Sequence, residues 1–133
     1  KNDFERAARD YDDAIRLEPK LEAAWNGRCW TRAILGQLQA ALTDCNTALR
    51  IKPSDAATYD SRGLTYLKMG QFDSAIEDYS SALRFEPKLA SALYGRGLSR
   101  LKKGDASGGN ADLTAAKTFK ATIADDFSRY GVK

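Results

Sequence analysis

The chain has 133 residues, of which 43% are hydrophobic, and this length suits one domain with a modest core. Its 21 basic and 18 acidic residues alternate along the sequence and leave a net charge of only +3, which argues against nucleic acid or a membrane surface as the main partner. With no histidine and only two cysteines, the composition argues against a zinc site, and we expect neither a metal nor a cofactor.

Apolar residues recur at spacings of three and four along the chain, which predicts a series of short helices. The first helix is expected at 3–17, and Pro19 prevents its continuation. The following helices are expected at 21–35, 38–51, 55–69, 72–85, 89–103 and 109–119. Gly70 is expected to end its helix in the left-handed conformation and to begin a tight turn. A short amphipathic helix is expected at 122–130, followed by Gly131 as a stop.

The helices repeat with a fixed period. Pro19, Pro53 and Pro87, the only prolines, lie 34 residues apart. The same step connects two further columns, which are Ala14, Ala48, Ala82 and Ala116, and Asp10, Asp44, Asp78 and Asp112. A period of this length is typical of stacked helical hairpins.

One segment carries a recognisable motif. Residues 56–87 contain Tyr59, Arg62-Gly63, Tyr66, Ala75, Tyr79, Ala82 and Pro87 at the spacing of a tetratricopeptide repeat. The chain therefore resembles the tetratricopeptide-repeat family, and its Arg-Gly version of the motif is similar to that of bacterial members. The resemblance implies an all-α fold, an α-α superhelix (solenoid) of antiparallel helical hairpins with about three and a half repeats and a C-terminal capping helix.

The register divides the single domain, 1–133, into five segments. They are the second helix of a truncated repeat at 1–21, repeats at 22–55 and 56–89, a divergent repeat at 90–121 and the capping helix at 122–133. Because the sequence opens in the middle of a repeat, we expect it to lack a natural start. At the other end Ala121 replaces a fourth proline, and the cap predicts a genuine C-terminus.

Two charged columns predict ion pairs inside the hairpins. A separation of 16 residues brings the middle of one helix beside the middle of the next, and Arg can hold a carboxylate with two parallel hydrogen bonds. The expected structural pairs are Arg28–Asp44, Arg62–Asp78 and Arg96–Asp112. An anionic-ligand site along the arginine column is the alternative.

Cys29 and Cys45 occupy columns that other repeats fill with packing residues, so we expect both to be buried thiols. The alternative is a disulfide between the two helices of one hairpin, which an oxidising compartment would permit.

In the tetratricopeptide family the first helix of each hairpin lines a concave surface that binds extended peptides or partner helices. Carried over to this sequence, the resemblance places a groove along Asn26, Trp30, Asp60, Leu64, Tyr94 and Leu98. Packing between neighbouring first helices is the alternative for Trp30, Leu64 and Leu98. The clamp that some relatives use for terminal carboxylates is not expected, since its columns here hold no lysine or arginine.

The predicted function is a protein–protein interaction module or scaffold. Self-association through the face of 3–17 is the first alternative, and nucleic-acid binding through Lys68, Lys102 and Lys103 is a weaker one. No motif indicates an enzyme, and the paired Asp125 and Asp126 are read as a solvated turn. The sequence leaves the compartment open, with the cytoplasm favoured and the periplasm as the alternative.

Overall fold

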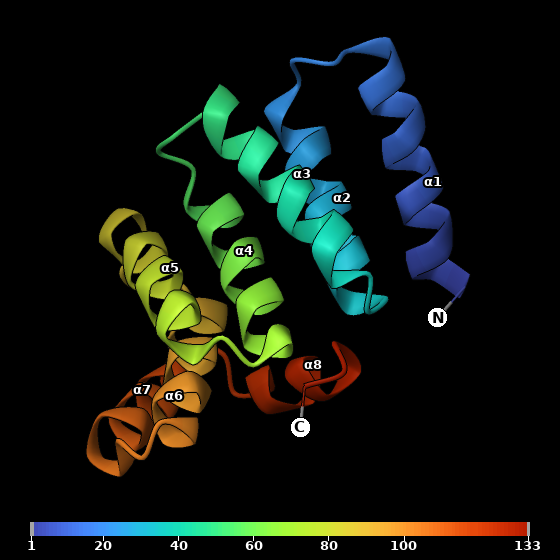
Figure 1. Ribbon diagram of the computed structural model, residues 1–133. Coiled ribbons are helices and arrows are strands. Elements are labelled where there is room, and N and C mark those ends of the chain that lie inside the picture. Colours follow the sequence, from blue (N-terminus) through green and yellow to red (C-terminus); the bar gives the residue numbers. More distant parts are fainter. Residues whose placement is uncertain (1, 133) are drawn as a thin grey trace.

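A computed structural model describes residues 2–132, and within that range all regular structure is helical. The helices are α1 (Asn2–Leu17), α2 (Glu22–Ile34), α3 (Leu38–Ile51), α4 (Ala56–Met69), α5 (Phe72–Phe85), α6 (Ala90–Lys102), α7 (Ala106–Phe119) and α8 (Ile123–Arg129). They form the all-α hairpin array that the repeat predicts (Figure 1).

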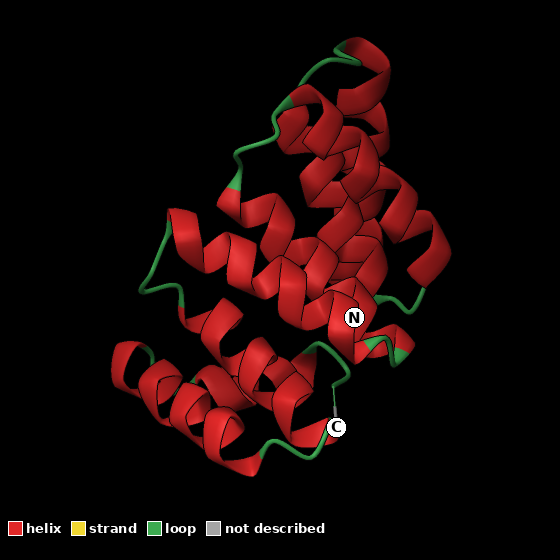
Figure 2. Cartoon of the chain, turned by 60° about the vertical axis from the view of Figure 1, so that its left-hand side comes forward, coloured by secondary structure: helices red, strands yellow, loops and turns green. Residues whose placement is uncertain are grey.

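Successive hairpins stack through the second helix of one and the first helix of the next, α3 on α4 and α5 on α6, and also through neighbouring first helices. α2, α4 and α6 each pair with the helix that follows, and α4 also packs against both α2 and α6 (Figure 1). Figure 2 shows the helices of the array and the loops that join them. α1 packs against α2 alone among the described helices, and α8 packs against α6 and α7. The first helices therefore form one layer of the solenoid and carry its concave face. No helix in residues 2–132 is long and apolar enough to cross a membrane.

The turn inside each hairpin has the same construction. Gly36, Gly70 and Gly104 follow the first helices with φ values of 84°, 79° and 92°, a region that glycine enters without steric cost. The next residue closes the turn onto the helix in each repeat, as when Gln71 N donates to Tyr66 O at 2.9 Å. The sequence predicts this feature correctly.

Aromatic residues anchor the loops between hairpins. The Trp25 indole donates to Pro19 O at 2.7 Å, and the Tyr59 hydroxyl donates to Pro53 O at 3.1 Å. The guanidinium of Arg28 lies over Trp25, 5.1 Å from the ring centroid, which adds a cation–π contact. The same contact thus recurs after 34 residues: an aromatic side chain in the first turn of a hairpin donates to the carbonyl of the proline in the loop before it.

The structure brings each predicted Arg and Asp together as a two-bond pair. Arg28 donates to both oxygens of Asp44 at 2.9 Å, and Arg62 donates to those of Asp78 at 2.7 and 2.9 Å. The third pair, Arg96 with Asp112, has distances of 2.9 and 3.0 Å. These side chains hold the two helices of each hairpin together inside the array.

The cysteine prediction was wrong in one respect. Both side chains are fully buried, as expected, but they form a disulfide between α2 and α3 instead of remaining thiols. The neighbouring repeat explains why the positions meet. Gly63 and Tyr79 hold the corresponding places, and a Cβ added at Gly63 would lie 2.8 Å from the Tyr79 ring. Two short side chains meet in the first complete hairpin where a glycine and a tyrosine meet in the second.

Two expectations for the C-terminal part were also wrong. α7 begins at Ala106, three residues before the expected start, because Asp105 accepts a hydrogen bond from Gly108 N at 2.9 Å and caps the helix. Asp126 is buried rather than solvated, and Lys120 lies 2.6 Å from its Oδ2. Asp125, its neighbour, is exposed.

Candidate functional site

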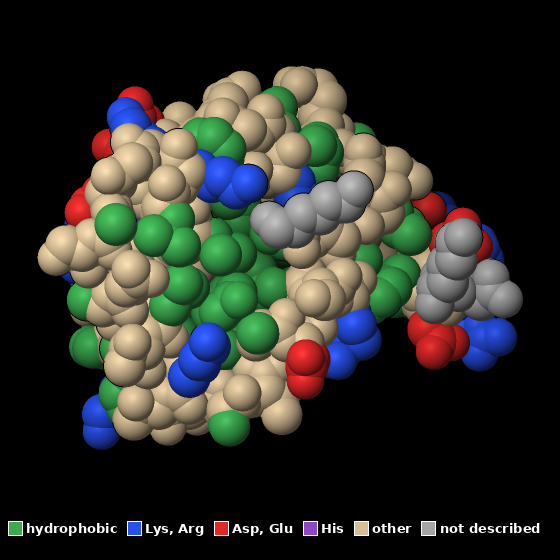
Figure 3. All heavy atoms as spheres, turned by 90° about the horizontal axis from the view of Figure 1, so that it is seen from below, with side chains coloured by type: hydrophobic (Ala, Val, Ile, Leu, Met, Phe, Trp, Pro, Cys, Tyr) green, Lys and Arg blue, Asp and Glu red, His purple; other side chains and the backbone are tan. Residues whose placement is uncertain are grey.

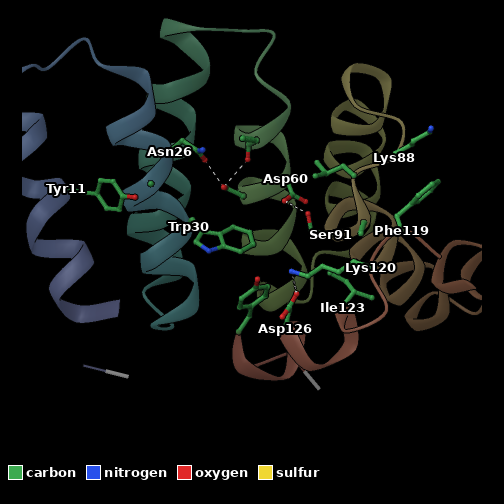
Figure 4. Close-up of a pocket in the computed structure, with 16 residues that line it drawn as sticks. Tyr11, Asn26, Trp30, Asp60, Lys88, Ser91, Phe119, Lys120, Ile123 and Asp126 are labelled. Atoms are coloured by element: carbon green, nitrogen blue, oxygen red, sulfur yellow. Dashed lines mark hydrogen bonds and ion pairs between the residues drawn. The ribbon is translucent and has the colours of Figure 1, made fainter. Parts of the chain in front are cut away.

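The candidate site is a hollow on the concave face with a volume of about 560 Å³ (Figure 4). Residues of α2, α4 and α6 line it from one side, and residues of the C-terminal segment line it from the other. The predicted groove residues Asn26, Trp30 and Asp60 are part of this lining.

Polar side chains of successive first helices meet at the floor of the hollow. Ser61 Oγ donates to Asn26 Oδ1 at 2.6 Å, which connects α4 to α2. Ser91 Oγ donates to Asp60 Oδ2 at 2.7 Å, which connects α6 to α4. The hollow therefore has a continuous polar strip that crosses the direction of the helices, as an extended ligand would.

Asp60 is the buried charged group of this strip. Only 8% of its surface is exposed, and its Oδ1 has no hydrogen-bond partner in the described part of the chain. Burial raises the pKa of the carboxyl to about 7, and the charge of Glu86 acts in the same direction, while the hydrogen bond from Ser91 opposes both. The group therefore changes protonation near neutral pH.

Aromatic rings connect the first helices with the C-terminal segment. Trp30 and Tyr130 pack edge to face with ring centroids 4.9 Å apart. The rings of Tyr94 and Phe127, the latter in α8, pack with their centroids 4.8 Å apart. Phe127 is only 2% exposed, so it belongs to the core as much as to the site. The C-terminal helix thus lies against the concave face and covers the part nearest Tyr94.

Lys68 fastens this arrangement. Its ammonium group donates to Ala33 O and Tyr130 O at 2.7 Å each, and to Ile34 O at 3.2 Å. Through these bonds Lys68 of α4 connects the end of α2 with the residue that follows α8. Burial lowers the pKa of the Lys68 ammonium.

The six predicted groove residues therefore separate into two groups. Asn26, Trp30 and Asp60 line the hollow. Tyr94 lies under α8, Leu64 is fully buried, and Leu98 packs against the core. Sequence reasoning missed Tyr130 and Lys120 as lining residues, because neither belongs to a repeating column.

Two of the three basic residues considered for nucleic-acid binding, Lys68 and Lys103, have other contacts. Lys68 is engaged with backbone carbonyls, and Lys103 pairs with Asp73. Figure 3 shows the face seen from below, where apolar side chains gather in a hollow with basic side chains near its edge. A hollow of about 300 Å³ at the end of α4, lined by Leu67, Phe72, Lys102 and Val132 among others, combines apolar and basic groups in this way.

Comparisons with known proteins agree with the repeat. A family model described as "Tetratricopeptide repeat" matches residues 1–56, and one described as "TPR repeat" matches residues 63–104. No curated protein matches the chain.

Several solved structures share the fold at low sequence identity. A thermophilic TPR protein of Thermus thermophilus, TTC0263, is 19% identical with a TM-score of 0.82, over 96% of this chain and 75% of that one. The structure "MamA 41-end from Desulfovibrio magneticus RS-1" is 21% identical with a TM-score of 0.76, over 91% of this chain and 68% of that one. A further MamA structure is 20% identical with a TM-score of 0.67 and covers 94% and 93% of the two chains.

The family models together cover most of the chain and support a protein-interaction scaffold of a family that is typically non-catalytic, and the solved structures agree with them on the fold. The chain belongs to the tetratricopeptide-repeat family.

Proposed function

We propose that the concave face binds an extended segment of a partner protein in the hollow along Asn26, Asp60 and Trp30. The observation that carries this proposal is the polar strip that crosses α2, α4 and α6 beside the rings of Trp30 and Tyr130. An extended backbone needs hydrogen-bonding groups at intervals, and rigid aromatic rings bury large areas of a ligand at low entropic cost.

The position of α8 limits where the segment lies. Since Phe127 covers Tyr94, the bound segment uses the part of the face formed by α2, α4 and the start of α6. Tyr94, Leu64 and Leu98 then support the groove from beneath and do not contact the ligand.

The proposal is tested by blocking the hollow with one bulky residue. Ala57 is exposed and lines the hollow, while Ala111 is an exposed alanine of α7, outside that lining. Peptides selected from a displayed random library on the wild-type chain are titrated against Ala57→Trp and Ala111→Trp. We expect a loss of at least tenfold in affinity for Ala57→Trp alone, with equal helicity of both variants by circular dichroism. Equal binding by both variants would contradict the proposal.

Self-association is a second candidate, and the surface near the start of the chain favours it. Leu17 is 78% exposed and Leu21 is 43% exposed, while α1 has α2 as its only helical neighbour in the described range. Sedimentation analysis of the wild type against Leu17→Glu tests this candidate. A concentration-dependent dimer that the substitution abolishes supports it, and a monomer at all concentrations contradicts it.

The disulfide also bears on the compartment. Structural disulfides persist in oxidising surroundings, so we infer that the chain works outside the reducing cytoplasm, as in a periplasm. Thiol alkylation of the protein inside its native cells, before lysis, tests this inference. If the alkylating reagent modifies Cys29 and Cys45 after denaturation without a reductant, the two residues are free thiols in the cell, and the inference is contradicted.

A further inference from the structure

We propose that the hollow recognises a basic side chain of the bound segment, a lysine or an arginine whose cationic group meets Asp60. The stem of that side chain lies between the Trp30 ring and the first turn of α6. This inference rests on the function proposed above and adds the chemical class of the ligand.

The missing partner of Asp60 is the first argument. Buried carboxylates in proteins are almost always paired or hydrogen-bonded, because an unsatisfied buried charge is costly. Here Ser91 satisfies Oδ2 at 2.7 Å, whereas Oδ1, an almost fully buried atom, has no partner among residues 2–132. Figure 4 shows the carboxyl group at the edge of the same space that Trp30 and Ser91 border. A ligand cation that enters this space lies beside the carboxylate and offsets the cost of its burial.

The surroundings select a cation over an anion. Aromatic faces attract cations, and Trp30 and Tyr130 line the hollow together with Asp60. Lys120, a basic group of the opposite wall, pairs with Asp126 at 2.6 Å, and Asp126 also pairs with Arg129. Lys88 is exposed at the rim. A ligand carboxylate would therefore be repelled by the buried Asp60 at the floor, and Lys88 offers it a cation only at the rim.

The protonation of Asp60 gives the proposal a measurable signature. Burial raises the pKa of the free carboxyl to about 7, and an adjacent ligand cation lowers it again. Binding then releases a proton and strengthens as the pH rises from 6 to 8. α2 contributes only uncharged residues to the lining, which are Asn26, Gly27 and Trp30. The other titratable groups that line this region or act on it are Tyr11, Asp78, Tyr79, Glu86, Lys88, Lys120, Asp126, Arg129 and Tyr130.

The test compares matched peptides on matched variants. One library-selected peptide is synthesised with its basic residue and with norleucine at that position, which keeps the stem and removes the charge. Both peptides are titrated by calorimetry against the wild type, Asp60→Asn and Asp73→Asn. Asp60→Asn keeps an oxygen for Ser91 to bond, and Asp73 is an exposed carboxylate of α5 outside the lining of the hollow.

We expect the norleucine peptide to bind the wild type and Asp73→Asn at least tenfold more weakly than the basic peptide. On Asp60→Asn the two peptides should differ by less than threefold, and the proton release on binding should vanish.

The inference is overturned if the preference for the basic peptide is the same on Asp60→Asn as on the wild type, or if the selected peptides share no basic residue. In those cases a peptide still blocked by Ala57→Trp leaves the proposed groove standing. If Ala57→Trp binds like the wild type, the groove proposal fails and this inference fails with it.

Discussion

Trp30 of α2 and Tyr130, the residue after α8, pack edge to face with their ring centroids 4.9 Å apart. The contact joins the first complete hairpin to the end of the described chain, across the concave face. Lys68 strengthens it from the middle hairpin by donating to Tyr130 O at 2.7 Å. The C-terminal segment is therefore more than a cover for the last repeat, since α8 packs on the third hairpin and Tyr130 contacts the first two.

Removal of the Phe127 ring should destabilise the whole array. The ring is 2% exposed and lies 4.8 Å from Tyr94 and 5.5 Å from Tyr130. We expect Phe127→Ala to lower the free energy of unfolding by about 3–5 kcal/mol, the usual cost of a buried Phe→Ala change. Denaturant unfolding followed by circular dichroism measures it. Phe119→Ala is the control, because Phe119 is 48% exposed and should cost far less. Equal losses would show that α8 does not contribute to the core.

Stability should depend on pH through Asp60. The folded-state pKa is raised to about 7 from an ordinary value of 3.8, so the folded chain binds more protons than the unfolded chain between these values. The free energy of unfolding should therefore fall as the pH rises from about 4 to 7, and then level off for this group. Asp60→Asn should remove this slope and leave the protein more stable at pH 8.

The comparison between the two proteins isolates Asp60 from Glu22, whose pKa is also raised to about 7, chiefly by the hydrogen bond with Asp55. Glu22 is retained in both proteins and contributes the same slope to each. Unfolding curves at pH 5, 6, 7 and 8 provide the measurement. Parallel pH profiles for the wild type and Asp60→Asn would contradict the assignment.

Removing only one partner of the ion pair between Arg62 and Asp78 should cost more stability than removing both. Asp78 is 4% exposed, and burial raises its pKa while Arg62 opposes that shift. Arg62→Met leaves a buried carboxylate without its cation, and we expect a loss of about 3–5 kcal/mol. The double variant Arg62→Met with Asp78→Leu should recover most of that loss, because no buried charge remains. Chemical denaturation of the single and double variants measures both effects.

A surface pair supplies the control for this series. Arg16 bonds Asp13 at 2.7 Å, but both side chains are largely exposed. Arg16→Met should therefore change stability by no more than about 1 kcal/mol. A loss at Arg16 as large as that at Arg62 would mean that burial is not the cause.

The repeat register predicts most of the fold, because each repeating residue has the same local task. Gly70 needs the left-handed region, Pro53 cannot continue a helix, and Arg62 and Asp78 meet because 16 residues separate them. The structure of every hairpin follows from such local rules. These local rules determine the fold and carry no information about which ligand the chain binds.

The site was harder to predict, since its distinctive parts break the repeat. Tyr130 reaches Trp30 through the packing of α8, which has no counterpart in other repeats. Asp60 aligns with Asn26 and Tyr94, so its column shows no common chemistry, and its burial depends on contacts with the next hairpin. A single sequence contains these residues but not the tertiary contacts that give them their role.

The disulfide replaces one aromatic packing unit, and the structure shows what would be needed to restore it. Tyr79 lies between Gly63 and Gly95, and a Cβ added at Gly95 would lie 2.2 Å from its ring. The corresponding positions one repeat earlier are Cys45, Cys29 and Ser61. A tyrosine at 45 therefore needs glycine at both 29 and 61.

A variant with two substitutions in this unit should be less stable than a variant with three. Cys29→Gly with Cys45→Tyr removes a crosslink that closes a loop of 16 residues, worth about 3 kcal/mol in the chain-entropy model, and also forces the new ring against Ser61. Adding Ser61→Gly should make room for the ring and recover part of the stability, although it removes the hydrogen bond to Asn26. Denaturant unfolding of the three proteins tests the order wild type, triple variant, double variant. A triple variant no more stable than the double would show that Ser61 does not govern this packing, because the added glycine would then have relieved nothing.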